Sequence, residues 1–244
     1  MRIAFSGTAN TGKSTMVRDF LTVWPMYSTP TKTYRDVITE NNLDINMQVN
    51  CLGQQKILDF MVESMKGKTV EDNVVCDRCP IDNVIYSMWA VEKQTGDITE
   101  EFVQKCIAVV RESIKDLDII FWLPFNEQIA IQDDNLRETD FAFIQEINNI
   151  FDVVHKQFLY NDKFPLFDPE DRPAMIEISA VGREQRILEV ANYIDLQGSS
   201  INPDDQWLKS LSSSQEAPEA KTAVEDLITQ QKHAALAETG TIVY

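Results

Sequence analysis

The sequence predicts a doubly wound α/β fold, in which a parallel β-sheet is covered by helices on both faces. Four short apolar segments, at residues 2–6, 73–77, 117–123 and 175–179, are typical of buried strands. They lack the strict alternation of polar and apolar residues that marks a sheet with one solvated face. Helical spacing fills the intervals between them, and this alternation of strand and helix favours a parallel sheet.

The predicted elements follow one another in a regular order. The strand at 2–6 leads through a loop into a helix at 13–23. A second strand is expected before Thr33, in a stretch rich in proline and threonine. Another segment opens at 34–38, and further helical segments are predicted at 54–65, 81–92, 100–114, 141–158 and 182–193.

The composition divides the chain into a main domain, residues 1–196, and an acidic tail, residues 197–244. The tail contains a serine-rich stretch typical of a linker. Beyond it, apolar residues are spaced as one stripe of a short helix: Val224, Leu227, Ile228 and Leu236. We expect this helix to dock on the domain or on another copy of the chain, which would make a homo-oligomer. The alternative is a mobile extension with no specific role.

The net charge argues against general nucleic-acid binding. The chain carries a formal charge of -17, from 22 basic and 39 acidic residues. Such a surface repels a polyanion except in a locally basic cleft. No apolar run approaches the length of a membrane span, and the phosphate-binding loop described next follows the first strand directly. We therefore expect a cytoplasmic protein with no membrane partner.

The most specific motif is GTANTGKST, which matches G-x-x-x-x-G-K-[ST] between a predicted strand and a predicted helix. Gly7 and Gly12 let the backbone curl around phosphate oxygens. Lys13 is expected on the β- and γ-phosphates of ATP, Ser14 on Mg²⁺, and Thr15 near the α-phosphate. The nine candidate cofactor-binding residues of this P-loop are Gly7, Thr8, Ala9, Asn10, Thr11, Gly12, Lys13, Ser14 and Thr15.

The next motif lies in NVVCDRCPID, where an apolar strand delivers Asp77 to its carboxyl end and Arg78 follows. Here the sequence resembles P-loop nucleoside and nucleotide kinases, in particular deoxynucleoside monophosphate kinases and nicotinamide riboside kinase-like ATPases. The resemblance implies that Asp77 acts on the acceptor hydroxyl or in the Mg²⁺ shell, and that Arg78 contacts substrate or phosphate. Two other P-loop classes fit less well. A motor-type ATPase would usually place a second acid after Asp77, where this sequence has Arg78. A GTPase would need an Asn-Lys-x-Asp sequence after a later strand, and the sequence has none. Asp77 as a simple helix cap is the structural alternative.

The resemblance covers residues 1–196 and implies a P-loop NTPase-type three-layer fold with a kinase-like lid and a C-terminal extension. The lid corresponds to DDNLRETD, with Arg137 as the arginine that closes over the transferring phosphate. A solvated start of a helix is the alternative there. The loop ISAVGREQR would pass the adenine ring, with Gly182 and Arg183 as candidates, although an ordinary strand-to-helix turn fits it equally well.

Acceptor recognition is assigned to five residues. Arg35 is a candidate for gripping an acceptor phosphate, and Tyr34 for stacking on a base. Gln54 and its neighbour Gln55 are candidates for reading a base edge, and Arg78 completes the set. Surface positions are the alternative for each of them.

These assignments predict an ATP- and Mg²⁺-dependent phosphotransferase acting on a small acceptor, either a nucleoside or a (deoxy)nucleoside monophosphate, with the monophosphate favoured. Lys13, Asp77 and Arg137 are the predicted catalytic residues, and Ser14 and Asp77 the predicted metal ligands. The alternatives are a regulatory ATPase or nucleotide-dependent switch, a kinase acting on a modified base in DNA, and a noncatalytic binding protein on the same fold.

Overall fold

A four-stranded parallel sheet forms the centre of the computed structural model, which describes residues 1–66, 72–129, 139–201, 221–222, 224–230 and 233. The strands lie in the order β2-β1-β3-β4 within these residues, and the register pairs Phe5 with Asp77 and with Phe121. The bounds are Arg2–Ser6 for β1, Val74–Asp77 for β2, Ile119–Trp122 for β3 and Ala174–Glu177 for β4. The predicted parallel sheet is confirmed.

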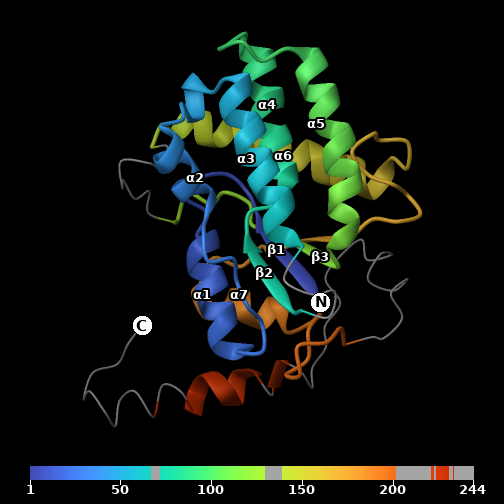
Figure 1. Cartoon of the computed structure of the whole chain (residues 1–244). Coiled ribbons are helices and arrows are strands. Elements are labelled where there is room, and N and C mark those ends of the chain that lie inside the picture. The colour runs from blue at the N-terminus through green and yellow to red at the C-terminus, as the bar shows by residue number, and fades with distance from the viewer. Residues whose placement is uncertain (67–71, 130–138, 202–220, 223, 231–232, 234–244) are drawn as a thin grey trace.

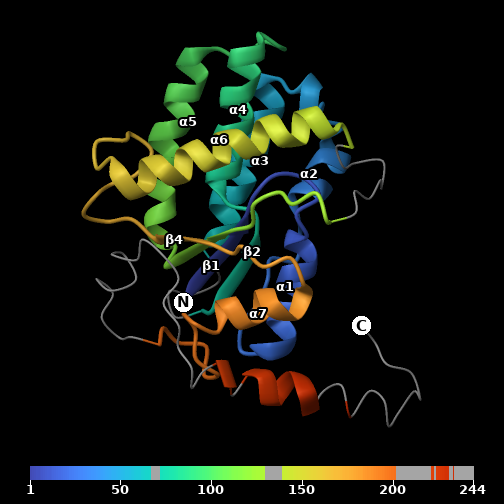
Figure 2. The same cartoon turned by 180° about the vertical axis from the view of Figure 1, so that it is seen from behind.

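Helices cover both faces of the sheet, which gives the three layers expected. One layer holds α3, Cys51–Met65; α4, Pro80–Lys93; α5, Glu100–Ser113; and α6, Phe141–Tyr160. The other holds α1, Lys13–Val23, and α7, Arg183–Val190, and Figures 1 and 2 show the two layers above and below the strands. A further helix, α2, Tyr34–Asn41, packs against α3.

Each strand supplies side chains to two separate cores, because successive residues of a strand point to opposite faces. In β1, Ala4 belongs to the core under α3 to α6, while Ile3 and Phe5 belong to the core under α1 and α7. In β3, Ile120 and Phe121 divide in the same way. Apolar residues on both faces explain why these strands lack polar alternation.

The prediction of a second strand before Thr33 is wrong. Among the described residues of that stretch, the only sheet-like pairing is an isolated bridge between Ser28 and Val74. Pro25 and Pro30 flank Ser28, and proline has no N–H to donate to a ladder. The chain therefore touches β2 at one point and continues as a loop to α2.

The tail contributes a helix that docks on the domain. Residues 221–222 and 224–230 are helical, and Figures 1 and 2 show this segment in red beside α1 and α7. Val224 is fully buried in the core of that layer, and Leu227 and Ile228 pack against the same core. The docking expected of the tail helix is thus seen for these three residues, while Leu236 lies outside the described part of the chain.

None of the described helices is long and apolar enough to cross a lipid bilayer.

Candidate active site

The candidate site lies at the carboxyl ends of the central strands, where the chain leaves β1 for α1 and β2 for α4. Neighbours β2 and β3 lie on opposite sides of β1, so the loops that follow the strands diverge and leave a crevice. A cavity of about 270 Å³ occupies this position. It runs from the P-loop to side chains of α2, α3 and α4.

Two glycines of the P-loop are required by its geometry. Gly7 has a φ of +139°, and a Cβ there would lie 2.5 Å from the carbonyl oxygen of Leu123. Gly12 has a φ of +85°, and its Cβ would lie 3.0 Å from Nη1 of Arg186. Residues other than glycine are strained at these positive φ values because they carry a Cβ. The loop therefore keeps close contact with β3 on one side and α7 on the other.

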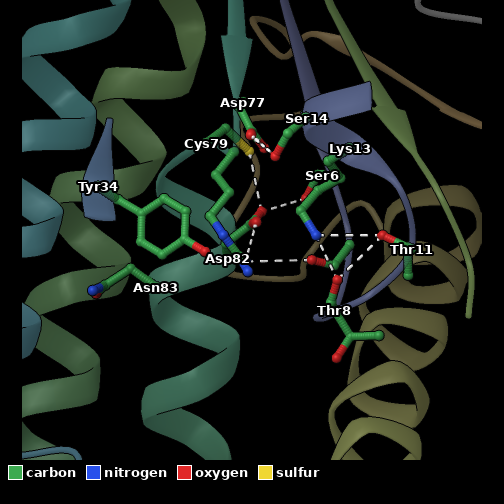
Figure 3. Close-up of polar contacts among 12 residues, drawn as sticks. Ser6, Thr8, Thr11, Lys13, Ser14, Tyr34, Asp77, Cys79, Asp82 and Asn83 are labelled. Carbon is green, nitrogen blue, oxygen red and sulfur yellow. Dashed lines mark hydrogen bonds and ion pairs between the residues drawn. The ribbon is translucent and has the colours of Figure 1, made fainter. Parts of the chain in front are cut away.

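Lys13 is buried at the start of α1 and points back across the loop. Its Nζ donates hydrogen bonds to the carbonyl oxygen of Thr8 at 2.5 Å and to Oγ1 of Thr11 at 3.3 Å, as Figure 3 shows. Burial lowers the pKa of Lys13 to about 7; repulsion from Arg78 adds to this effect, and Asp82 opposes it. An anion in the loop would restore the charge of this ammonium group.

Ser14 and Asp77 meet on the other side of the loop. The Oγ of Ser14, in the first turn of α1, donates a 2.5 Å hydrogen bond to Oδ2 of Asp77, at the end of β2 (Figure 3). A hydroxyl and a carboxylate are the hard oxygen ligands that Mg²⁺ takes, with phosphate and water oxygens supplying the remainder. Among the described residues no cluster of three or more His, Cys, Asp or Glu side chains could hold a metal ion by itself. The pair thus fits Mg²⁺ bound together with phosphates.

Arg78 is held in a buried network rather than extended into the cavity. Its backbone has a φ of 86°, which is unusual for a residue with a side chain. Its Nη1 lies 2.9 Å from Oδ2 of Asp82, and its guanidinium lies 4.6 Å from the ring centre of Tyr34 and 5.5 Å from that of Tyr86. Asp82 also accepts a hydrogen bond from Ser6 at the end of β1 (Figure 3). The network links β1, β2, α2 and α4 at the cavity wall.

The far end of the cavity carries a pair of buried amides. Gln54 on α3 is 4% exposed and Asn83 on α4 is 2% exposed. Nδ2 of Asn83 donates to the carbonyl oxygen of Gln54 at 2.9 Å and also to its Oε1. Oδ1 of Asn83 is buried and makes no hydrogen bond with any described residue. Tyr34 also lines the cavity and lies near Asn83 (Figure 3), so this end of the cavity combines neutral polar groups with an aromatic ring.

Near α7 the cavity is bounded by the loop that follows β4. Val181, Arg183 and Arg186 line it there. Arg183 forms two hydrogen bonds with the carboxylate of Asp19 on α1, at 2.9 and 2.5 Å. This arginine is therefore tied to α1 at the edge of the cavity.

A family model described as an AAA domain matches residues 2–161, well over half of the chain. The chain belongs to the AAA domain family. The match runs from β1 through the whole of α6 and so includes the P-loop, Asp77 and the amide pair of this AAA domain. No curated protein sequence matches the chain.

Solved structures share the fold of this AAA domain at low sequence identity. Deoxyadenosine kinase from M. mycoides, with dCMP and dCDP bound, is 18% identical with a TM-score of 0.56, and the match covers 79% of this chain and 97% of the kinase. NadR in complex with NAD and AMP-PNP is 15% identical with a TM-score of 0.54, over 82% of this chain and 50% of NadR. The AAA domain therefore has a P-loop kinase fold.

The structure brings most of the predicted site residues together. The cavity is lined by twelve of them: Ala9, Asn10, Gly12, Lys13, Ser14, Thr15, Tyr34, Arg35, Gln54, Asp77, Arg78 and Arg183. Gly7, Thr8 and Thr11 shape the loop behind this lining. Gly182 begins α7 as its N-cap and is not part of the lining. Gln55 is exposed and bonded to Asp59, and Arg137 lies outside the described residues.

The lining residues that the sequence analysis missed include four that take part in the contacts described above: Asp82, Asn83, Tyr86 and Arg186. The first three follow Arg78 at helical spacing, on the face of α4 that turns toward the P-loop. Polar residues on the otherwise apolar α4 are a signal that could have found them. Arg186 adjoins the apolar Ile187 in α7, and its role depends on a contact with the distant P-loop that no local pattern contains.

Proposed function

We propose that this chain is an ATP- and Mg²⁺-dependent phosphotransferase that moves the γ-phosphate of ATP to a nucleoside or a nucleoside monophosphate. The observation that carries the proposal is a single cavity with two chemically different ends. One end is the P-loop with Lys13, and the other is the buried amide pair Gln54 and Asn83. A donor phosphate and an acceptor base held at these ends would share one enclosed space, as phosphoryl transfer requires.

At the donor end the chain supplies charge and fixed dipoles. Lys13 would hold the β- and γ-phosphates, and the N–H groups of the loop would point at their oxygens. Ser14 and Asp77 would hold Mg²⁺, which when bound neutralises charge on the transferring group. The hydrogen bond between these two side chains supports a role of Asp77 in the metal shell. Orientation or deprotonation of the acceptor hydroxyl by the same carboxylate is the second assignment.

At the acceptor end the amide pair supports recognition of a nucleobase. Since Nδ2 of Asn83 is engaged with Gln54, its unpaired Oδ1 is left as an acceptor, and Nε2 of Gln54 is a donor. An adjacent donor and acceptor match the hydrogen-bonding edge of a nucleobase, and burial without such a partner is costly. Tyr34 supplies the aromatic face on which a base would stack.

Arg35, rather than Arg78, supports a monophosphate as the acceptor. Arg78 forms an ion pair with Asp82, so its charge is partly neutralised within the protein. Arg35 lines the cavity beside Tyr34, and we assign it to an acceptor phosphate. Arg137, in the segment that corresponds to the lid, is proposed to close over the γ-phosphate. The loop containing Val181 and Arg183 is proposed to hold the adenine ring of ATP.

The test is ADP release from Mg-ATP by wild type and Lys13→Ala, across nucleosides, nucleoside monophosphates, nicotinamide riboside and short DNA, with product masses recorded. We expect a rate that appears with one acceptor class and falls about a hundred-fold or more in Lys13→Ala. Lys156→Ala, at an exposed ion pair with Asp152, is the matched control and should leave the rate unchanged. Hydrolysis that ignores the acceptor would favour the regulatory ATPase, and nucleotide binding without turnover would favour a binding protein.

A further inference from the structure

A buried arginine outside the P-loop motif joins the two loops at the nucleotide end of the cavity. Arg186, in α7, is 5% exposed and lines the cavity. Its Nη1 donates a 2.6 Å hydrogen bond to the carbonyl oxygen of Thr11 in the P-loop. Its Nε donates a 2.8 Å hydrogen bond to the carbonyl oxygen of Ala180, in the loop between β4 and α7. One rigid guanidinium thus spans two loops that are far apart in the sequence.

The loop at Ala180 has a second anchor on the same helix. The carboxylate of Glu189 accepts hydrogen bonds from the N–H of Ala180 at 3.2 Å and from Oγ of Ser179 at 3.1 Å. The backbone of Ala180 is therefore held at both its N–H and its C=O by side chains of α7. Any displacement of this loop must move α7 or break these hydrogen bonds, and the contact with Arg186 passes such a displacement to the P-loop.

The contact with Thr11 fixes the direction of a P-loop amide. The carbonyl of Thr11 and the N–H of Gly12 belong to one trans peptide, in which the two groups point in opposite directions. Since Arg186 holds the carbonyl oxygen, the N–H of Gly12 must point away from Arg186. The tight approach of Arg186 to Gly12, 3.0 Å from the position of a Cβ, leaves this peptide little room to rotate.

Arg186 also carries a charge that no carboxylate of the described residues neutralises by an ion pair. Burial lowers the pKa of this guanidinium, and the more distant Glu189 partly opposes the effect. Arginine nevertheless stays charged in proteins. Within the part of the chain that the structure describes, this positive charge has no ion-pair partner at the back of the loop that is proposed to hold phosphates, which favours an anion there.

From these contacts we infer that Arg186 is a positioning residue that couples the base-binding loop to the P-loop, so that a bound base strengthens the grip on the phosphates. The inference rests on the proposed function for the assignment of the loop at Ala180 to the base of ATP. It predicts that the two parts of the nucleotide bind cooperatively, and that the cooperativity depends on both hydrogen bonds of one side chain.

The experiment compares the affinities of full-length wild type and Arg186→Lys for Mg-ATP and for inorganic tripolyphosphate by titration calorimetry. Lysine keeps the charge but cannot span both carbonyl oxygens with a planar fork. We expect ATP to bind about ten-fold more weakly and tripolyphosphate about three-fold more weakly or less, since hydrogen bonds to charged groups contribute on the order of ten-fold each. Equal weakening of both ligands, or none, would overturn the coupling.

The matched control is Arg172→Lys. Arg172 is a half-buried arginine that likewise donates to a backbone carbonyl, that of Phe158 at 2.7 Å, and it lies away from the cavity lining. Its substitution should leave the ratio of the two affinities unchanged. If Arg186→Lys does not fold, hydrogen exchange on wild type decides instead. Tripolyphosphate, which has no base, should protect the amides of residues 179–182, and unchanged exchange there would contradict the inference.

The outcomes also separate the inference from the proposed function. A wild type that binds ATP but transfers phosphate to no acceptor would refute the proposed function, while the affinity ratio would still decide the coupling. Intact phosphate transfer with equal weakening of both ligands would refute the coupling alone. A wild type that binds neither ligand would refute both.

Discussion

At the scale of single residues, Lys13 has a property that links nucleotide binding to pH. Its pKa is lowered by burial from 10.5 to about 7, so the folded protein without nucleotide holds this side chain largely neutral above that pH. Phosphates in the loop would favour the charged form. We expect ATP binding near pH 8.5 to take up about one proton, measured by calorimetry in two buffers of different ionisation enthalpy. Identical heats in the two buffers would contradict this expectation.

The same residue predicts the direction in which stability changes with pH. Between about 7 and 10.5 the unfolded chain binds a proton on Lys13 that the folded chain lacks. The free energy of unfolding contributed by this group therefore rises with pH across that window. Lys13→Met should remove this rise, which urea titrations at pH 7 and 9 can compare, and the proton uptake on ATP binding should disappear in the same variant.

The P-loop glycines make a third prediction about single residues. In Gly7→Ala the new methyl group would meet the carbonyl oxygen of Leu123 at 2.5 Å with the backbone at a φ of +139°, so we expect a loss of about 2 kcal/mol or more in the free energy of unfolding. Gly182→Ala is the matched control, because Gly182 has a φ of -71° and its Cβ would meet the movable end of Gln185. Urea denaturation of both variants measures the difference, and equal losses would argue against strain at Gly7.

The amide pair makes a fourth prediction about single residues. Asn83→Leu removes the buried oxygen proposed to read the acceptor base, so the KM for the acceptor should rise on the order of ten-fold or more while the KM for ATP stays unchanged. Steady-state kinetics with each substrate varied in turn measures both constants. Asn149→Leu, on an exposed position of α6, should change neither. A parallel rise of both constants in Asn83→Leu would indicate a general disturbance of the site rather than base recognition.

At the scale of elements, the tail helix is predicted to stabilise the domain on which it docks. Val224 is fully buried against the core under α1 and α7, and a carboxylate at that position would be buried without a partner. Val224→Asp should therefore cost about 2–4 kcal/mol in the free energy of unfolding. Gln230→Asp, at an exposed position of the same helix, adds the same charge and should cost almost nothing. Urea denaturation checks both, and equal midpoints would mean that the helix does not dock in solution.

Much of the fold could be predicted from the sequence because its signals are local. The bounds of β1 and α1 agree with the prediction to the residue, since an apolar run, the P-loop and an amphipathic pattern follow one another without a gap. The strand expected before Thr33 failed because Pro25 and Pro30 deprive that stretch of backbone donors. The contacts of Arg78 with Tyr34 and of Arg186 with Thr11 could not be predicted, because they depend on how α2 and α7 pack against distant parts of the chain.

At the scale of the whole molecule, the formal charge of -17 predicts weak binding to nucleic acid. A polyanion approaching this surface is repelled, so we expect no measurable binding of a short DNA duplex or single strand at physiological salt, and little change as salt is lowered. The test is fluorescence anisotropy of labelled DNA at salt concentrations from about 50 to 200 mM, because binding that releases counterions weakens steeply over this range. Tight binding that weakens steeply with salt would favour the alternative of a kinase for a modified base in DNA.

The two layers of helices divide the cavity between them. The P-loop end is lined by residues of α1 and α7, and the end with the amide pair by residues of α2, α3 and α4, while the sheet lies between the two main cores. Under the proposed function, substitutions in α2 to α4 can change the acceptor without disturbing the packing that holds ATP. The fold is thus open to divergence in one layer at a time, and relatives with the same P-loop need not share a substrate.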